Sequence, residues 1–343
     1  MSERPFDMSA AFEEVSAGAV GVSPAKPRQA RAGFLPPLAG IAWLALALIA
    51  YRRPEDGDFP LTDPFALLAA LSAVTILAAT LAARRSYTAA IRIKGSAPWL
   101  IALAAFLAAW EIATAKLALL PMPFFPPPQA VLDVFVEDWP KLGESVWRSL
   151  LLLGGGCAIG AAIGFVTGVA VGWSRLAGYW AHPILRFVGP LPATAWLPLA
   201  FFVFPSSWSA STFLVALATG FPVTVLTWSG VAGVNKAFYD VARTLGADNR
   251  FLVLKVAIPA ALPHVFVGLF MGLGGSFAVL VGAEMLGVKA GLGWYLQWAQ
   301  GWAAYANMYG ALIVMALLCS GLITLLFRLR DRVLSWQKGL VQW

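Results

Sequence analysis

Residues 235–259, NKAFYDVARTLGADNRFLVLKVAIP, form the most informative polar interruption in an otherwise apolar chain. Tyr239 to Leu245 has helical propensity, and Gly246 can adopt the left-handed conformation that ends a helix. Phe251 to Val256 restarts an apolar stretch, and Pro259 marks the start of the next long one. We therefore predict a short amphipathic helix, a sharp turn and a second helix that leads into a membrane.

The composition of the whole chain indicates a membrane protein. Of its 343 residues, 60% are hydrophobic and only 12% are charged, whereas about 25% of a soluble domain is charged. A chain of this length cannot hide so much apolar surface in one soluble core. The net charge of +7 is distributed between apolar segments, so it indicates membrane topology rather than binding to nucleic acid.

Eight stretches are apolar enough for membrane helices, which need about 20 residues to cross a bilayer. The fold class that we expect is therefore an all-α membrane protein with about eight transmembrane helices. The fifth stretch is interrupted by prolines, which membrane helices tolerate where neighbouring helices satisfy the freed carbonyls. The predicted spans are 35–51, 65–83, 98–120, 146–173, 191–204, 211–234, 261–285 and 308–327.

The basic residues orient these spans. If the amino terminus is cytoplasmic, most of the 24 Lys and Arg residues lie in inside segments, including 84–94, the loop 175–186 and the loop 235–259. This distribution follows the positive-inside rule and places both termini in the cytoplasm. The basic stretch 84–94 also separates the first two spans from the rest. We expect a disordered cytoplasmic tail at 1–33, an accessory region with two spans at 34–96 and a working unit at 97–343.

No set of residues favours catalysis. The sequence has no glycine-rich loop that ends in Gly-Lys-Ser or Gly-Lys-Thr, so we expect no P-loop. His182 and His264 lie at separate predicted membrane borders, where an interfacial side chain is expected rather than a metal ligand or a base. Cys157 and Cys319 lie in apolar stretches and are expected to be small buried side chains. We expect a non-enzymatic chain with no metal and no cofactor of its own.

The fourth predicted span carries a glycine at every fourth position. A spacing of four places these glycines on one helix face, where a partner backbone can approach closely. Ordinary tight packing explains this pattern, and a smooth face that permits sliding between conformations is the functional alternative. The glycines are Gly156, Gly160, Gly164, Gly168 and Gly172.

Three charged residues lie at or near membrane depth, where such groups usually face a cavity or a partner. Glu111 and Lys116 are five positions apart, which is off the favourable spacing of three or four. Lys116 is therefore expected to extend outward to the membrane surface. Glu284 and Glu111 are candidates for a translocation pathway or gate. For Glu284, hydrogen bonding to backbone amides of the following turn is the structural alternative.

The helix in the polar loop has two physical interpretations. With Tyr239, Arg243 and Leu245 available at the cytoplasmic face, it suits a groove on a partner protein. It suits equally well a connector that lies on the lipid headgroups. The physical chemistry of the segment leaves both open.

The loop resembles the EAA signature of permease subunits of bacterial ABC importers. That signature runs Glu-Ala-Ala, three residues, Gly, nine residues, then Ile-x-Leu-Pro. Asp240 keeps the charge of the first position but is one methylene shorter than Glu, so its particular contact is the weakest part of the match. The residues that fall on the signature are Asp240, Val241, Ala242, Gly246, Val256, Ile258 and Pro259.

Other segments are similar to the nitrate/sulfonate/taurine branch of that family. The resemblance extends over about residues 98–336 and implies a type I importer core of six helices, preceded by two extra helices. It implies a permease that moves a small anion such as nitrate, a sulfonate or taurine across a bacterial inner membrane. The similar segments are 110–111, 120–128, 190–198, 242–247, 259–263, 283–287 and 291–293.

The resemblance also implies partners. A second copy of the permease would complete a homodimer in the lipid bilayer, a separate P-loop ATPase would bind ATP and Mg, and an extracytoplasmic solute-binding protein would deliver the substrate. A secondary transporter would favour buried ionisable groups and inverted repeats, and a membrane enzyme would need a convergent catalytic set, so both are weaker alternatives. The implied ATPase-coupling residues are Tyr239, Asp240, Ala242, Arg243, Leu245, Gly246 and Pro259.

Overall fold

The computed structural model describes residues 34–52, 59–83 and 87–337. Within these ranges every regular element is a helix, which confirms the expected all-α class. The cytoplasmic tail predicted for residues 1–33 lies outside the described residues. The chain forms two compact units, and the division between them falls at Leu117 and Ala118.

The first unit is a small helical assembly. It consists of α2 (Leu35–Arg52), α3 (Thr62–Ala82), α4 (Tyr87–Glu111) and the π-helix η1 (Ile112–Lys116). Trp43 of α2 donates a hydrogen bond to the carbonyl of Leu100 in α4 at 3.1 Å. The boundary that we expected between residues 96 and 97 lies inside α4, because the helix continues through Gly95 and Pro98. The third predicted span therefore packs with the first two, and the functional division of the chain stays a prediction.

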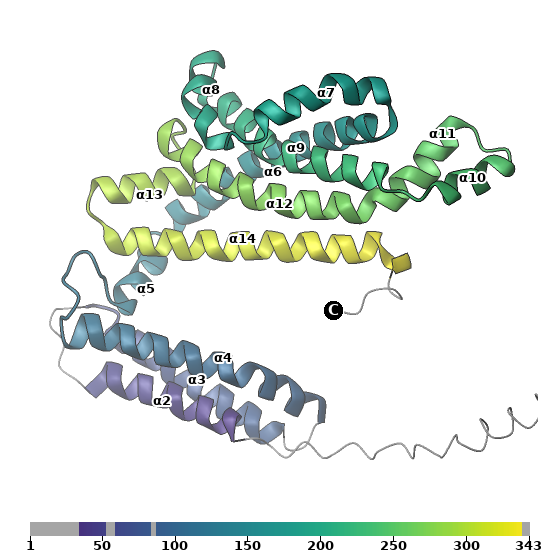
Figure 1. The fold of residues 1–343 in the computed structure, drawn as a ribbon. Helices are drawn as coiled ribbons and strands as arrows, with labels where there is room; N and C mark the ends of the chain where they lie inside the picture. The colour runs from purple at the N-terminus through teal and green to yellow at the C-terminus, as the bar shows by residue number, and fades with distance from the viewer. Residues whose placement is uncertain (1–33, 53–58, 84–86, 338–343) are drawn as a thin grey trace, which may run out of the picture. The chain divides into compact units, whose positions relative to one another are not determined.

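The second unit is built around α9, against which α6 and α12 pack along their lengths. The largest cluster of buried apolar side chains lies where these helices meet α8, α13 and α14, and Figure 1 shows α14 running alongside α12. The elements are α5 (Pro128–Glu137), α6 (Trp139–Trp173), α7 (Arg175–Val188), η2 (Ala193–Trp196), α8 (Leu197–Val203), α9 (Ser207–Ala232), α10 (Lys236–Thr244), α11 (Asn249–Phe251), η3 (Leu252–Ala257), α12 (Ile258–Leu286), α13 (Leu292–Gly301), α14 (Tyr305–Val333) and η4 (Ser335–Gln337).

The candidate membrane helices correspond to most of the predicted spans. Six helices of the described residues are long and apolar enough to cross a membrane, and the bent pair of α7 with η2–α8 is a seventh candidate. The shorter apolar helix Leu35–Tyr51 coincides with the first predicted span, but it is too short to be counted among these candidates. Large apolar side chains such as Val166 and Leu317 remain exposed, as suits a surface in contact with equally apolar lipid tails.

The structure corrects the prediction for residues 175–204. The predicted span 191–204 is only the second half of a broken element, in which α7 and η2–α8 are bent by 86°. Pro190 and Pro192 lie at the bend, where the proline ring and the missing N–H prevent a continuous helix. The segment 175–186, which its charges assigned to a cytoplasmic loop, is therefore helical and packs along α6.

The five glycines that recur at every fourth position of α6 all lie at the contact with α9. A Cβ added at Gly160 would lie 2.9 Å from the Cα of Ala216, and one at Gly164 would lie 2.5 Å from the carbonyl oxygen of Gly220. Gly156, Gly168 and Gly172 face the side chains of Val215, Thr227 and Val231 at similarly short range. From the opposite side, Gly268 and Gly272 of α12 meet the α9 backbone. The structure thus places all five α6 glycines where backbones approach closely, while sliding along this face stays a prediction.

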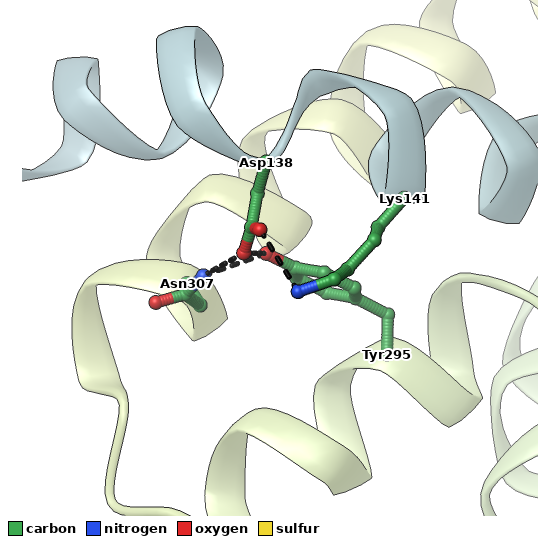
Figure 2. A network of polar contacts seen from close by, with 4 residues as sticks. All are labelled: Asp138, Lys141, Tyr295 and Asn307. Atoms are coloured by element: carbon green, nitrogen blue, oxygen red, sulfur yellow. Dashed lines mark hydrogen bonds and ion pairs between the residues drawn. The ribbon is translucent and has the colours of Figure 1, made fainter.

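Two helices that the sequence did not predict, α5 and α13, meet at Asp138. The Asp138 carboxylate accepts hydrogen bonds from Tyr295 Oη at 3.0 Å, Asn307 Nδ2 at 2.6 Å and Lys141 Nζ at 3.1 Å (Figure 2). Burial raises the pKa of the Tyr295 phenol to about 12, so it remains a proton donor near neutral pH. This network holds α13 and the start of α14 against the start of α6.

Candidate functional site

The polar loop forms α10 and α11 at the end of the α9–α12 pair opposite to α8 and α13 (Figure 1). Asn235 begins α10, because its side-chain oxygen accepts a hydrogen bond from the Ala237 N–H at 2.9 Å. This is the role of an N-cap residue, whose side chain satisfies a backbone donor that has no helical partner. The helix therefore begins at Lys236, three residues before the predicted start at Tyr239.

Gly246 reverses the chain after α10, as predicted. Its φ is +85°, in the left-handed region. The Gly246 N–H donates to the carbonyl of Arg243 at 2.9 Å, and the Ala247 N–H donates to that of Ala242 at 3.0 Å. This pair of bonds defines a Schellman motif, in which glycine is favoured because it carries no Cβ. Asp248 then begins α11 and accepts a backbone N–H at 2.8 Å.

The chain returns to the membrane without a break. After α11 it passes through the π-helix η3 into α12, and the stretch Asn249–Leu286 forms one candidate span. Pro259 follows directly after this π-helix within the continuous helical run, and because it has no N–H it cannot donate to a carbonyl of the preceding turn. Leu252 and Ala257 of η3 are buried. The loop is therefore firmly joined to the bundle at its carboxyl end.

The side chains of α10 divide between the bundle and the outside. The Tyr239 ring lies edge-on against Trp173 of α6, with ring centres 5.8 Å apart, and partial burial raises its pKa. Phe238, Val241 and Leu245 point away, with 61%, 61% and 83% of their surface exposed. Tyr239 therefore attaches α10 to α6, whereas the exposed apolar face includes Phe238, which the sequence analysis missed. The spacing of three and four residues along this face was the signal that identifies Phe238.

Charged and polar residues surround that apolar face. Asp240 and Arg243 are exposed, and Ala242 is half-buried. Within the described part of the chain, Asp240 makes no hydrogen bond or ion pair. A groove of about 450 Å³, lined by α11, η3 and Trp173, lies beside the loop. An apolar patch with a polar surround is typical of protein interfaces. We therefore name Phe238, Val241 and Leu245 with this charged surround the docking face, and the binding of a partner there stays a prediction.

Glu284 holds the start of α13. Ser149 Oγ of α6 donates to the two Glu284 oxygens, which lie 2.7 and 2.9 Å away, and the Gly293 N–H donates at 2.8 Å. Ser149 in turn accepts the Leu292 N–H at 2.9 Å. Gly291 has a φ of +133°, and a Cβ there would collide with the Glu284 carboxyl group. Side chains of α6 and α12 thus accept hydrogen bonds from the first backbone amides of α13. This agrees with the structural role that the sequence analysis gave as the alternative for Glu284. A gating role for Glu284 stays a prediction.

Glu111 and Lys116 form a buried ion pair in the first unit. Their side chains are 0% and 1% exposed, with Lys116 Nζ 3.5 Å from Glu111 Oε1. Lys116 also donates to the carbonyl of Ala50 at 2.9 Å. The expectation that the spacing of five separates these residues and that Lys116 extends outward is wrong. Residues 112–116 form a π-helix, whose repeat of five residues places the two side chains on one face. A pathway role for Glu111 stays a prediction.

No metal site emerges from these contacts. Among the residues that the structure describes, no group of three or more His, Cys, Asp or Glu side chains could hold a metal ion. Cys157 and Cys319 are free thiols. That the chain has no cofactor of its own stays an expectation.

Replacing Glu284 with Gln should loosen the start of α13. Both oxygens of the buried Glu284 carboxyl group accept hydrogen bonds, and the amide of Gln would turn an N–H donor toward one of the groups that now donate to it. We expect the free energy of unfolding to fall by about 1–3 kcal/mol, measured by thermal unfolding of the purified chain in detergent. Glu137→Gln changes an exposed glutamate of α5 and should leave the melting temperature unchanged. Equal melting temperatures of the two variants would contradict the capping role.

The sequence of this chain matches a known protein family and several named relatives. Residues 160–337, just over half of the chain, match the family described as binding-protein-dependent transport system inner membrane component. A probable ABC transporter permease protein of Brucella abortus (strain 2308) is 28% identical over 250 residues, which cover 72% of this chain and 98% of the relative. The nitrate import permease protein NrtB of Synechococcus elongatus is 26% identical over 262 residues, 73% of this chain and 91% of the relative. The bicarbonate transport system permease protein CmpB of the same species is 30% identical over 190 residues, 55% of this chain and 65% of the relative.

Proposed function

Because the chain belongs to the family of binding-protein-dependent transport system inner membrane components, we propose that it is the membrane-spanning permease subunit of an ATP-driven importer of a small anion. The observation that carries this proposal is the docking face on α10, an exposed apolar helix face on a chain whose own sequence has no P-loop. A transporter of this kind must receive energy from a separate ATPase subunit, which binds ATP and Mg.

The structure supports a path for that energy. Phe238, Val241 and Leu245 would enter a groove on the ATPase, as an amphipathic helix enters a receptor groove. Tyr239 packs on Trp173 of α6, and α11 and η3 continue into α12. When ATP binding moves the ATPase subunits, α10 would therefore pull on α6, α9 and α12 together. A rigid connection of this type converts movement at a surface into rearrangement of packed helices.

The relatives support the anion as substrate class. One is named as a nitrate permease and another as a bicarbonate permease, and both substrates are small anions. We propose a substrate of this class, which includes nitrate, sulfonates and taurine. The assembly would hold two copies of the permease in a bacterial inner membrane, with both termini in the cytoplasm and a solute-binding protein on the outer side. ATP hydrolysis would belong to the partner, so the permease itself is not an enzyme.

Reconstitution tests this proposal. Proteoliposomes that contain the permease, its ATPase and its binding protein should accumulate labelled nitrate or bicarbonate only when ATP is present. Permease-dependent stimulation of ATP hydrolysis gives a second readout that needs no knowledge of the substrate. Uptake that continues when the ATPase is left out would contradict the proposal and would favour a secondary transporter.

Gly246→Pro should uncouple the ATPase by destroying the turn after α10. Proline removes the N–H that donates to Arg243 and fixes φ near −65°, whereas the backbone here is at +85°. We expect co-purification of the ATPase to fall at least tenfold, a change of about 1.4 kcal/mol or more in binding. The yield in the membrane should be retained, because a Cβ added at Gly246 would meet no heavy atom within 4 Å. Gly246→Asn is the matched control, since Asn tolerates the left-handed region, and normal co-purification with Gly246→Pro would exclude the docking role.

A further inference from the structure

The broken element brings one cation to membrane depth. Two contacts with α9 define the level of α7: the His182 ring lies against Trp228 with ring centres 4.5 Å apart, and a Cβ at Gly189 would lie 2.6 Å from the Phe221 ring. Along α9, Trp228 and Phe221 lie roughly 6 and 16 Å from the helix end that leads to α10, at 1.5 Å per residue. Arg186 lies between His182 and Gly189 in the last turn of α7. Its Cα is therefore inside the span, although the sequence assigned it to a cytoplasmic loop.

The Arg186 side chain points away from the rest of the bundle. The opposite side of α7 lines an apolar groove of about 780 Å³, to which it contributes Ala181, Leu185 and Val188. Residues of α6 and α9 form the other walls of this groove. Arg186 is exposed, as is its neighbour Phe187, which has 71% of its surface accessible. Across the described ranges, no carboxylate and no carbonyl oxygen pairs with the guanidinium of Arg186.

Such a charge does not belong on a lipid-facing surface. Arginine stays protonated at any pH that a protein meets, and a charged group in hydrocarbon is costly. Within membrane proteins such residues therefore face a water-filled cavity or a partner. The position of Arg186 just before an 86° bend adds to this argument, because broken helices near the middle of a membrane form substrate sites in transporters.

We propose that Arg186 lines the water-filled path through the assembled transporter and binds the anionic substrate during its passage. This inference rests on the proposed function, since it names the residue that recognises the anion. The planar guanidinium offers parallel N–H donors that match two oxygens of nitrate, bicarbonate or a sulfonate. Its open position on the exposed face of α7 allows an anion both to bind and to leave.

A thiol next to Arg186 reports on this environment without requiring a known substrate. In a Cys157→Ser/Cys319→Ser background, Phe187→Cys places the thiol one residue from the guanidinium. The complete transporter in proteoliposomes is then treated with two thiosulfonate reagents, anionic ethylsulfonate methanethiosulfonate and cationic ethyltrimethylammonium methanethiosulfonate. We expect both to react. Arg186→Gln should lower the ratio of anionic to cationic rates about tenfold, because a nearby unit charge acts on the two reagents with opposite sign.

Two further variants test whether the ratio of the two reaction rates depends on the charge at position 186 or on any cation of α7. Arg186→Lys should restore the ratio, since it keeps the charge at the same depth. Arg175→Gln removes an exposed cation at the other end of α7 and should change the ratio less than about twofold, since its charge is screened over this distance.

The outcomes are separable from those of the proposed function. If neither polar reagent modifies the thiol at position 187, this face lies against lipid and the proposal for Arg186 is overturned. If Arg175→Gln lowers the ratio as much as Arg186→Gln, the guanidinium acts at the membrane surface and the proposal is also overturned. Labelling does not depend on turnover, so a failure of ATP-driven uptake by the unmodified permease would overturn the proposed function alone.

Discussion

Leu245→Asp is expected to abolish binding of the ATPase while leaving the permease folded. Leu245 is 83% exposed and belongs to the docking face, so its replacement removes no core contact. A carboxylate at this position would have to be desolvated in an apolar groove without a partner, which is strongly unfavourable. Residues near the centre of an interface often contribute 2 kcal/mol or more, so we expect at least about a thirtyfold loss of affinity. Co-purification from the membrane and ATP-driven uptake should both disappear.

Leu329→Asp is the matched control for this result. Leu329 lies near the carboxyl end of α14 and is also exposed, at 51%. The substitution adds the same charge to the same chain but lies outside the docking face, so ATPase binding should stay within about twofold of the unmodified level, as for most surface changes. An equal loss in both variants would indicate a general effect of negative charge. Normal binding by Leu245→Asp would remove α10 from the interface.

Gly160→Val is expected to destabilise the fold more than any other variant considered. An added Cβ would lie 2.9 Å from the Cα of Ala216 and would also press on the carbonyl oxygen of that residue. Backbone atoms cannot rotate away as a side chain can, so α6 and α9 would have to separate. Overpacking of this type costs about 1–3 kcal/mol and sometimes more. In detergent, the melting temperature of the purified permease should therefore fall clearly.

Gly155→Val isolates the contact with α9. Gly155 is the preceding residue of the same helix, and an added Cβ there meets no heavy atom within 4 Å. Both variants share the change in helix propensity and in side-chain size, so their difference measures the lost approach of the two helices. The prediction fails if the two variants melt at the same temperature.

The sequence analysis located the turn and the helices of the polar loop 235–259 because the features of that loop are local. Gly246 ends α10 through its own backbone conformation, and Pro259 lies where η3 passes into α12. Asn235, by contrast, was not used as a cap, and the predicted start of α10 was therefore three residues late. The spacing of Phe238 from Val241 and Leu245 was also available in the sequence. The sequence did not show where Trp173 lies. In the structure Tyr239 packs against Trp173 and so attaches α10 to α6, instead of being exposed.

Interactions at longer range limited the other predictions. The π-helix at 112–116 lies where Glu111 and Lys116 pair inside the first unit, whereas their sequence spacing of five argued against pairing. Arg186, which was expected in a cytoplasmic loop, lies in the last turn of the helix α7, just before the 86° bend. The helix α13 is too short for a span. It is held by Glu284, which is close in sequence, and by Ser149 and Asp138 from distant parts of the chain.

The sequence by itself determined that this chain is helical and membrane-spanning, where most spans lie and where the polar loop turns. Those properties depend on the hydrophobicity of contiguous residues and on the backbone preferences of Gly and Pro, which act within a few positions. Only the tertiary structure decided which face of α6 meets α9, which residues of α10 remain exposed and how Glu284 and Arg186 are placed. Each of these depends on side chains that are far apart in sequence, and their distances exist only once the helices have packed.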